Sequence, residues 1–406
     1  MPLAVFERLL RGVVDRLRGS NLDDGRWRGH RTFLADGSSL SMPDTPALQE
    51  HFGQPGMQKT GCGFPIMHVL ALFHAATGLL LRVVASPLRT HDMSQIGLLH
   101  PELEPISGSR SGSETEAQAN VGPSSLALQS PTRYTHSKPA LAAGDVLVGD
   151  RAFCSFAHLA LLKARQIFGV FRVHQQQIVD FRPRRKAASA GSRKRGEKGR
   201  PSSRWLMRLG RHDQLVVYDK PKSRPCWLTA EAYAGLPATL VVRELRYTIR
   251  RRGYRTRLVT LATTLLDPAV YPAAEVAELY GRRWQVETNL RHLKQTLRMD
   301  VLRCQTIEGV QKELTMYGLV DNMVRLVMLE AAEQQHVPVE RISFIDAVRW
   351  LAAAVAGDAP LELRVNPNRP GRVEPRVIKR RSKTYSLMIH PRAVLRKRLL
   401  GNKHAA

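Results

Sequence analysis

The chain has 406 residues, of which 62 are Lys or Arg and 35 are Asp or Glu, so its formal net charge is +27. Such an excess suits a polyanionic partner, because each neutralised phosphate releases counterions. Aromatic residues make up only 6%, which disfavours a protein that stacks single-stranded bases and leaves double-stranded DNA as the better fit.

The four cysteines lie far apart and form no C-x-x-C pair: Cys62, Cys154, Cys226 and Cys304. They indicate neither a zinc site nor a disulfide framework, which favours a reducing compartment. An apolar stretch at residues 69–85 contains His74 and Arg82 and is too short to span a bilayer. We therefore expect a cytoplasmic protein, associated with the nucleoid when bound to DNA, with no membrane contact.

The first expected elements are a helix and several strands. Residues 3–18 place apolar side chains at helical spacing with arginines between them. They predict a helix that packs on the body, with a helix on a membrane surface as the alternative. Residues 31–36 predict a short strand that runs into Asp36 and a glycine turn. Residues 64–86 predict two strands, or a strand and a helix.

The middle of the chain alternates low-complexity and ordered segments. Residues 106–143 are dominated by Ser, Gly, Pro, Ala and Thr without an apolar period, which predicts a flexible linker or insertion. A buried type of strand follows at residues 144–149 and ends in Asp150. A helix at residues 158–166 and a strand at residues 167–174 are expected next.

Residues 182–200 hold nine Lys or Arg and one acid, which indicates either a solvated loop or a loop that binds DNA. Strand-like runs at 214–218, 238–248 and 254–264, the last two joined by an Arg-rich turn, predict a β-rich insertion. Further on, helices are expected as far as residue 356.

Residues 364–403 contain 13 Lys or Arg and one acid, with prolines and little periodicity. This composition predicts an irregular tail that either contacts DNA or is simply solvated.

Residues 280–294 are the most informative segment. At about 100° per residue on one helix, four polar side chains fall within an arc of roughly 60°: Tyr280, Arg283, Glu287 and Lys294. A second stripe, about 80° round, is apolar and would anchor the helix to a core: Leu279, Val286, Leu290, Leu293 and Leu297. An ordinary i,i+4 ion pair between Arg283 and Glu287 on a solvated surface is the alternative interpretation.

Three acids stand at or near the ends of expected elements: Asp36, Asp150 and Glu287. Phosphodiester chemistry with two metal ions needs carboxylates that converge from different elements. Hard ions such as Mg²⁺ prefer these oxygen ligands.

The spacing Tyr280-x2-Arg283-x3-Glu287-x6-Lys294 resembles the Y-R-E-K signature of the DDE transposases of bacterial insertion sequences, in the insertion sequence 4 family. Further likeness runs from about residue 28 to 350, in short segments at residues 35–38, 41–45, 144–153, 261–267 and 312–313.

This resemblance implies an α/β fold, with a ribonuclease-H-like catalytic core interrupted by a β-rich insertion and followed by a helical and basic C-terminal region. It also implies that the three acids, Asp36, Asp150 and Glu287, are catalytic and bind two Mg²⁺ or Mn²⁺ ions. Asp44 is the rival for Asp36, but Pro43 before it suits a turn better than a strand end.

The residues expected to bind DNA are Tyr280, Arg283, Trp284, Arg291 and Lys294. The resemblance assigns the Tyr, Arg283 and the Lys to holding the DNA end, and the fork of an arginine suits phosphate. Trp284 could stack on an unpaired terminal base or belong to the core.

The expected domain organisation has four parts: a short N-terminal helix at 1–27, a catalytic domain at 28–300, a helical part at 301–357 and a basic tail at 358–406. The catalytic domain would carry insertions at 106–143 and about 175–270. Members of the family usually have an end-recognition domain before the first catalytic Asp, and it is apparently missing here.

The expected function is that of a transposase, which performs metal-dependent DNA cleavage and strand transfer of the cut-and-paste type. Its partners would be the transposon ends and the target DNA, bound by a homodimer. One alternative is a truncated, inactive remnant that only binds DNA non-specifically. Another is a basic structural protein, which would not explain why one helical stripe gathers Tyr280, Arg283, Glu287 and Lys294.

Overall fold

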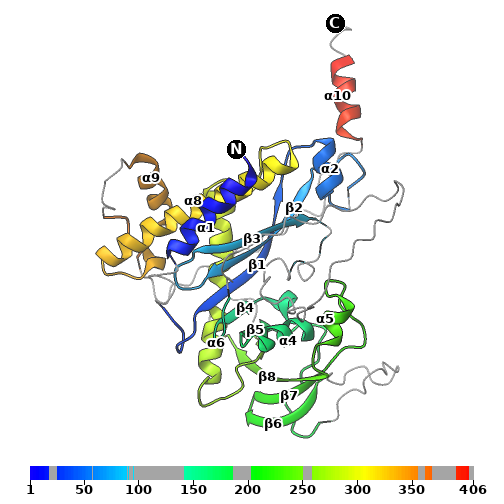
Figure 1. Cartoon of the computed structure of the whole chain (residues 1–406), viewed down its shortest axis with the longest axis vertical. Helices are drawn as coiled ribbons and strands as arrows, with labels where there is room; N and C mark the ends of the chain where they lie inside the picture. The colour runs from blue at the N-terminus through cyan, green and yellow to red at the C-terminus, as the bar shows by residue number, and fades with distance from the viewer. Residues whose placement is uncertain are drawn as a thin grey trace, which may run out of the picture.

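The computed structural model describes residues 1–17, 25–56, 58–88, 90, 95, 141–185, 203–249, 258–354, 362–367 and 390–401. The fold is mixed α/β, built on a nine-stranded sheet in the order β3-β2-β1-β4-β5-β9-β8-β7-β6 (Figure 1). Several predicted segments lie mostly or wholly outside the described residues: the low-complexity insertion, the basic stretch after residue 185, the turn at 250–253 and much of the basic tail.

One edge of the sheet is an antiparallel meander of β1 (Thr32–Ser41), β2 (Ile66–His74) and β3 (Leu80–Pro87). The segment at 64–86 is therefore two strands. The expectation that β1 ends at Asp36 was wrong, because β2 offers an unbroken ladder of partners beyond it. Asp36 pairs with Ala71 and Gly37 with Leu70, so the glycine is extended within a strand.

Two parallel strands continue the sheet from β1. β4 (Val146–Gly149) pairs with β1, and β5 (Phe168–Arg172) pairs with β4. The crossover between them runs through the short η3 (Arg151–Phe153) and α4 (Phe156–Ala164), which Ser155 caps at its N-terminus. These elements confirm the predicted strand, helix and strand, and parallel pairing needs such a crossover helix.

The expected β-rich insertion joins the same sheet. β9 (Leu258–Thr263) lies antiparallel to β5, and beyond it come β8 (Thr239–Thr248), β7 (Asp213–Asp219) and β6 (Arg204–Gly210). The sequence did not predict β6, because much of this edge strand is exposed and its register is irregular. A short helix, α5 (Ala230–Ala234), connects β7 to β8.

The segment around Glu287 is not one regular helix, as the stripe argument assumed. It consists of α6 (Ala273–Gly281), α7 (Trp284–Arg291) and a π-helical turn, η4 (His292–Thr296). The break follows Gly281, a poor helix former in an exposed position. A regular 100° step therefore does not apply from Tyr280 to Lys294. The directions of these side chains depend also on the break and on the π turn.

The remaining helices are α1 (Leu3–Leu17), α2 (Pro46–Phe52), α8 (Ile307–Gln334), η5 (Val339–Arg341), α9 (Phe344–Ala353) and α10 (Arg392–Gly401). The long α8 crosses the molecule beside β3 with α1 alongside it, which confirms the packing helix, and α10 projects from one end (Figure 1). The prediction of a wholly irregular tail was wrong at α10. No helix in the described ranges has the length and apolar character needed to cross a membrane.

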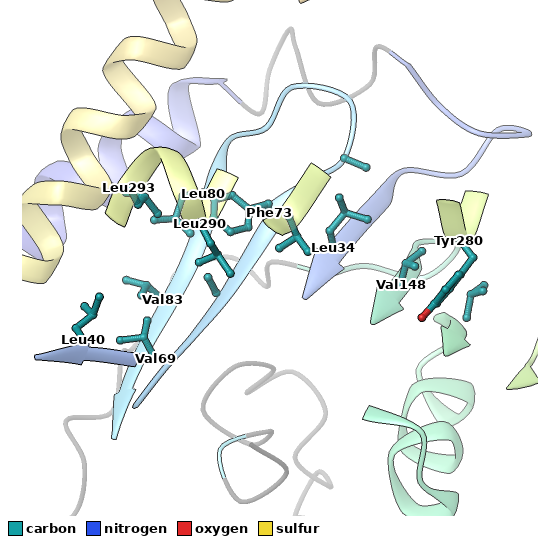
Figure 2. Close-up of a cluster of buried hydrophobic side chains, with 14 of the residues drawn as sticks. Leu34, Leu40, Val69, Phe73, Leu80, Val83, Val148, Tyr280, Leu290 and Leu293 are labelled. Carbon is teal, nitrogen blue, oxygen red and sulfur yellow. The ribbon is translucent and has the colours of Figure 1, made fainter. Parts of the chain in front are cut away.

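The sheet separates two hydrophobic cores. Alternate residues of β1 face opposite sides: Phe33 and Ala35 join the core beneath α4, whereas Leu34 joins the core beneath α6 and α7. Figure 2 shows this second core, in which Leu290 of α7 and Leu293 of the π turn lie over the strands. The predicted apolar stripe of the Glu287 segment is thus confirmed as its buried face.

Candidate active site

Charged side chains form a row across adjacent strands of the sheet. The parallel register pairs Ala35 with Gly149, and Gly149 with Phe171, so the next residues in line are Asp36, Asp150 and Arg172. By alternation they share the face of Leu34, Val148 and Val170, which is the face covered by α6 and α7. Two acids and one cation therefore lie side by side beneath the helix that carries Glu287.

Arg283 joins this row to the helix. It precedes α7, and its Nη1 donates to Oδ2 of Asp36 at 3.2 Å while its Nη2 donates to Oε1 of Glu287 at 2.7 Å. The i,i+4 pair foreseen as a surface interaction is present, but Arg283 is only 15% exposed and also binds an acid 247 residues away in sequence. One guanidinium thus brings the first and third predicted acids together.

The surroundings of the Asp36 carboxyl group disfavour its ionised form. Burial raises its pKa to about 6, although Arg283 and the backbone N–H of Gly37 both lower it. The nearby charges of Asp150 and Glu287 raise that pKa further. Three carboxylates therefore interact across β1, β4 and α7, and the single guanidinium only partly offsets their mutual repulsion.

Asp150 follows β4 directly, as the sequence predicted. Its Oδ1 accepts from the backbone N–H of Ala152 at 2.7 Å, so the side chain begins η3 and is held in place by its own turn. The side chain of Glu287 is 38% exposed and that of Asp36 is 18% exposed. Glu287 is therefore more accessible to solvent than Asp36.

Tyr280 does not lie on an exposed stripe. It is 8% exposed and belongs to the core under α6, where its ring lies close to Val148 (Figure 2). Burial raises the pKa of its hydroxyl, and the nearby charge of Asp150 raises it further, whereas Arg283 and Arg172 lower it. The hydroxyl therefore belongs to the electrostatic surroundings of the acids although the ring is a core residue.

Lys294 reaches the strand that carries Asp36. Its Nζ donates to Oγ of Ser38 at 3.2 Å and to the backbone oxygen of Ser39 at 2.8 Å. Lys294 belongs to the π turn, and it contacts β1 two and three residues beyond Asp36.

Trp284 and Arg291 are both exposed, the Trp at 49%. The question left open by the sequence is decided against a core tryptophan, since a large aromatic ring stands in solvent at the start of α7. Asp44, the rival of Asp36, lies near α2, where it accepts from Gln49 at 2.7 Å and pairs with Arg392 at 3.3 Å. It takes no part in the row of acids.

The donor set suits a hard divalent cation. Asp36, Asp150 and Glu287 supply only carboxylate oxygens, and the guanidinium of Arg283 already stands in for a cation between two of them. In the part of the chain that the structure describes, no three Asp, Glu, His or Cys side chains are close enough to enclose an ion as they stand. The chemistry of the three carboxylates therefore suits such an ion, whereas their spacing in the structure does not enclose one.

Arg172 is a site residue that the sequence analysis missed. It lies at the end of β5, next to Asp150 in the register, and it lowers the pKa values of Tyr280 and Tyr247. The sequence did not mark it, because the predicted strand ran on to residue 174 and only the strand register sets Arg172 beside Asp150. A lone arginine in a chain with 62 Lys and Arg did not stand out.

Comparisons with known proteins identify the family. The sequence model of the family described as "Transposase DDE domain" matches residues 115–323, which is more than half of the chain. The chain belongs to this family.

Two relatives of the same kind come from Escherichia coli (strain K12). The transposase InsG for insertion sequence element IS4 is 32% identical over 131 residues, which are 32% of this chain and 27% of InsG. The putative transposase InsZ is 32% identical over 81 residues, 20% of this chain and 26% of InsZ. The matched parts span about a quarter of these relatives. The resemblance to insertion-sequence DDE transposases is confirmed.

Among solved structures, a piggyBac transposase synaptic complex with hairpin DNA covers 80% of this chain and 55% of its own, with a TM-score of 0.35 and 10% identity. So distant a similarity adds nothing to the assignment.

Proposed function

We propose that this DDE-family chain is an insertion-sequence transposase that cleaves and transfers DNA strands with the help of divalent metal ions. The observation that carries the proposal is the meeting of three acids from β1, β4 and α7, with Arg283 bonded to two of them. A group of carboxylates in which burial raises the pKa of one member is typical of functional sites.

The arrangement of the strands supports a ribonuclease-H-like core. Three antiparallel strands, β3, β2 and β1, are followed by the parallel β4 and β5, and the acids lie on the central strands of that group. In this interpretation β6 to β9 are the β-rich insertion, which enters the chain between β5 and α6 and extends the same sheet.

Asp36, Asp150 and Glu287 would hold two Mg²⁺ or Mn²⁺ ions. Bound there, the ions would supply charge to activate the attacking oxygen and to stabilise the leaving one. The chain's own cations orient the DNA: Arg283 offers a bidentate fork for a phosphate, and Lys294 offers a point charge beside it. Trp284, exposed at the start of α7, can stack on an unpaired base, and Arg291 adds a further phosphate contact.

The proposed reaction has two balanced steps. Water attacks a phosphodiester at the transposon end, so one P–O bond forms, one breaks, and a 3′ hydroxyl leaves with a proton. That hydroxyl then attacks a phosphodiester of the target DNA, which replaces one P–O bond by another. The net charge of +27 favours binding of both duplexes, and we propose that a homodimer holds them.

The test is a cleavage assay with purified protein and supercoiled plasmid that carries the element's ends. We expect nicking with Mg²⁺ or Mn²⁺, none with EDTA, and none with Asp150→Asn, which keeps the shape and removes the charge. Asp267→Asn is the matched control, because Asp267 is exposed and lies outside the row of acids. Nicking by Asp150→Asn at the parent rate would refute the assignment. Binding without any cleavage by the parent would favour the inactive remnant.

A further inference from the structure

A buried ion pair lies behind the helix that carries Glu287, and the proposed chemistry does not use it. Asp321 is 0% exposed and Arg325 is 5% exposed, both on α8, with Nε of Arg325 at 3.8 Å from Oδ2 of Asp321. Burying two charges is expensive, and an apolar pair of the same volume would often be no less stable. The pair therefore calls for an explanation other than stability.

The guanidinium of Arg325 donates hydrogen bonds to α7, the helix that carries Glu287, and to the π turn after it. Its Nη2 donates to Oδ1 of Asn289 at 2.9 Å and to Nδ1 of His292 at 3.1 Å. Asn289 lies two residues after Glu287, which is about 200° round the helix. Arg325 therefore contacts α7 on the side opposite Glu287. His292 is the first residue of the π turn.

The acceptor state of His292 agrees with this role. Burial lowers its pKa to about 3, and the charges of Arg325 and Arg291 lower it further, so the ring is neutral and Nδ1 can accept. The His292 ring stacks on the ring of Phe344 with centroids 4.2 Å apart, and the guanidinium of Arg325 lies 4.8 Å from the centroid of the Phe344 ring. Phe344 of α9 thus packs against both His292 and Arg325.

The helix that supplies Arg325 is itself fastened to the sheet. Asn322, one turn away and 0% exposed, exchanges two hydrogen bonds with the backbone of Leu80 in β3, at 2.8 and 2.9 Å. Gly78, with a φ of 74°, brings the β2–β3 turn so close that a Cβ there would lie 3.0 Å from Nη1 of Arg325. The contacts with β3 and the β2–β3 turn therefore fix the position of Arg325 relative to the sheet that carries Asp36.

We infer that Arg325 is a positioning residue, which holds the junction between α7 and the π turn so that Glu287 and Lys294 face the acids of the sheet together. The role of Glu287 and Lys294 in this inference rests on the proposed function. The positioning itself rests on the two hydrogen bonds that Arg325 donates at the junction. Glu287 lies five residues before His292 and Lys294 two after it, so one guanidinium controls the register of both. A π turn is an irregular hydrogen-bond pattern that needs such external support.

The experiment compares Arg325→Lys with Arg243→Lys. Lysine keeps the charge but cannot bond both acceptors in the plane of a fork. Arg243 is the matched control, a fully buried arginine on β8 that pairs with Asp213 and does not contact α7. Both variants are expected to lose stability, so a difference between them reports position and not general weakening.

The first measurement is amide hydrogen exchange, which needs neither metal nor activity. In Arg325→Lys we expect the amides of residues 288–297 to exchange about tenfold faster than in the parent at conditions of equal global stability. Arg243→Lys should leave that segment unchanged. Unaltered exchange at 288–297, or an equal rise throughout the chain, would overturn the inference.

The second measurement is the affinity for Mn²⁺ by titration calorimetry. Arg325→Lys should bind Mn²⁺ about tenfold more weakly than the parent, and Arg243→Lys should match the parent. Parent-like affinity in Arg325→Lys would refute the positioning role. If the parent itself binds no Mn²⁺, the proposed function fails, and the exchange data still decide the inference. Should Arg325→Lys not fold, Asn289→Ala removes one acceptor and is expected to show the same pattern more weakly.

Discussion

Arg243 on β8 and Arg283 at the start of α7 are two cations that meet carboxylates in opposite ways. Arg243 is fully buried and donates to both oxygens of Asp213 and to the backbone oxygen of Tyr271 at 2.6 Å, so its charge and its donors are matched. Arg283 divides its donors between Asp36 and Glu287, with Asp150 close by. Arg283 is thus shared between two acids from different elements.

The difference separates a structural ion pair from a site. Around Arg243 the charges cancel and the fold closes over them. Around Arg283 the pKa of Asp36 is raised to about 6, chiefly by burial, and Glu287 remains 38% exposed. A group of carboxylates that includes a perturbed pKa and is partly open to solvent is what a metal ion would complete.

The largest expected effect comes from a change at the candidate site around Arg283. Glu287→Gln keeps the size of the side chain and removes a charge, so metal-dependent cleavage should fall by at least about a hundredfold. DNA binding should be kept or become tighter, because an anion has been lost. The control is Glu278→Gln, an exposed acid on α6. Plasmid nicking and duplex binding measure the two properties, and normal cleavage by Glu287→Gln with Mg²⁺ would refute the two-metal assignment.

The next effect breaks the structural side. Arg243→Met leaves Asp213 buried without its partner and should lower the free energy of unfolding by about 3 kcal/mol. Arg283→Met should cost only about 1 kcal/mol, because Glu287 is 38% exposed and can be hydrated, and because Asp36, whose pKa is already about 6, can take up a proton. Urea unfolding of both variants at pH 7.5 makes the measurement. Equal losses would mean that Arg283 is as much a structural cation as Arg243.

The raised pKa of Asp36 gives a dependence of stability on pH. Its folded-state value of about 6 lies above the ordinary value of 3.8, so the ionised group weakens the folded state above about pH 6. Asp36→Asn should therefore raise the free energy of unfolding at pH 7.5 by roughly 1 to 2 kcal/mol in EDTA. The gain should shrink as the pH falls and vanish below about pH 4. A difference between variant and parent that is constant from pH 4 to 7.5 would contradict this account.

The smallest effect sharpens the role of the two cations at the site. Arg283→Ala and Lys294→Ala should each reduce the slope of log affinity against log salt concentration by about one, since each removes one phosphate contact. Lys163→Ala is the control, because Lys163 is exposed on α4, over the other face of the sheet. Binding of a short duplex across a salt series gives the slopes. Slopes that match the control would place both cations away from the DNA.

Much of the framework followed from local patterns. The strands that carry Asp36 and Asp150, the crossover helix α4 and the buried stripe of the Glu287 segment were all predicted, because alternation and helical spacing are written in neighbouring residues. The family resemblance then named the acids, Arg283 and Lys294. The roles of these residues stay predictions, whereas the structure shows that Arg283 bonds Asp36 and Glu287 and that Lys294 contacts β1.

Two of the errors have a cause that lies outside the segment concerned. Asp36 is in the middle of β1 because β2 supplies partners past the glycine. Arg172 was overlooked because only the strand register sets it beside Asp150. The third error has a local part, since the helix breaks after Gly281, and a distant part, since Arg325 from α8 donates to His292 where the π turn begins.

The sequence by itself determined the charge of the protein, the presence of β1, β4, β5 and the crossover helix α4, and the residue types of its site, because these depend on composition and on spacing along the chain. Only the tertiary structure decided that Tyr280 is buried, that Arg283 bridges two acids from different elements and that a neutral His292 accepts a bond from Arg325. Burial, pKa and hydrogen-bond partners depend on which distant segments approach, and that approach is set by the packing of the whole chain.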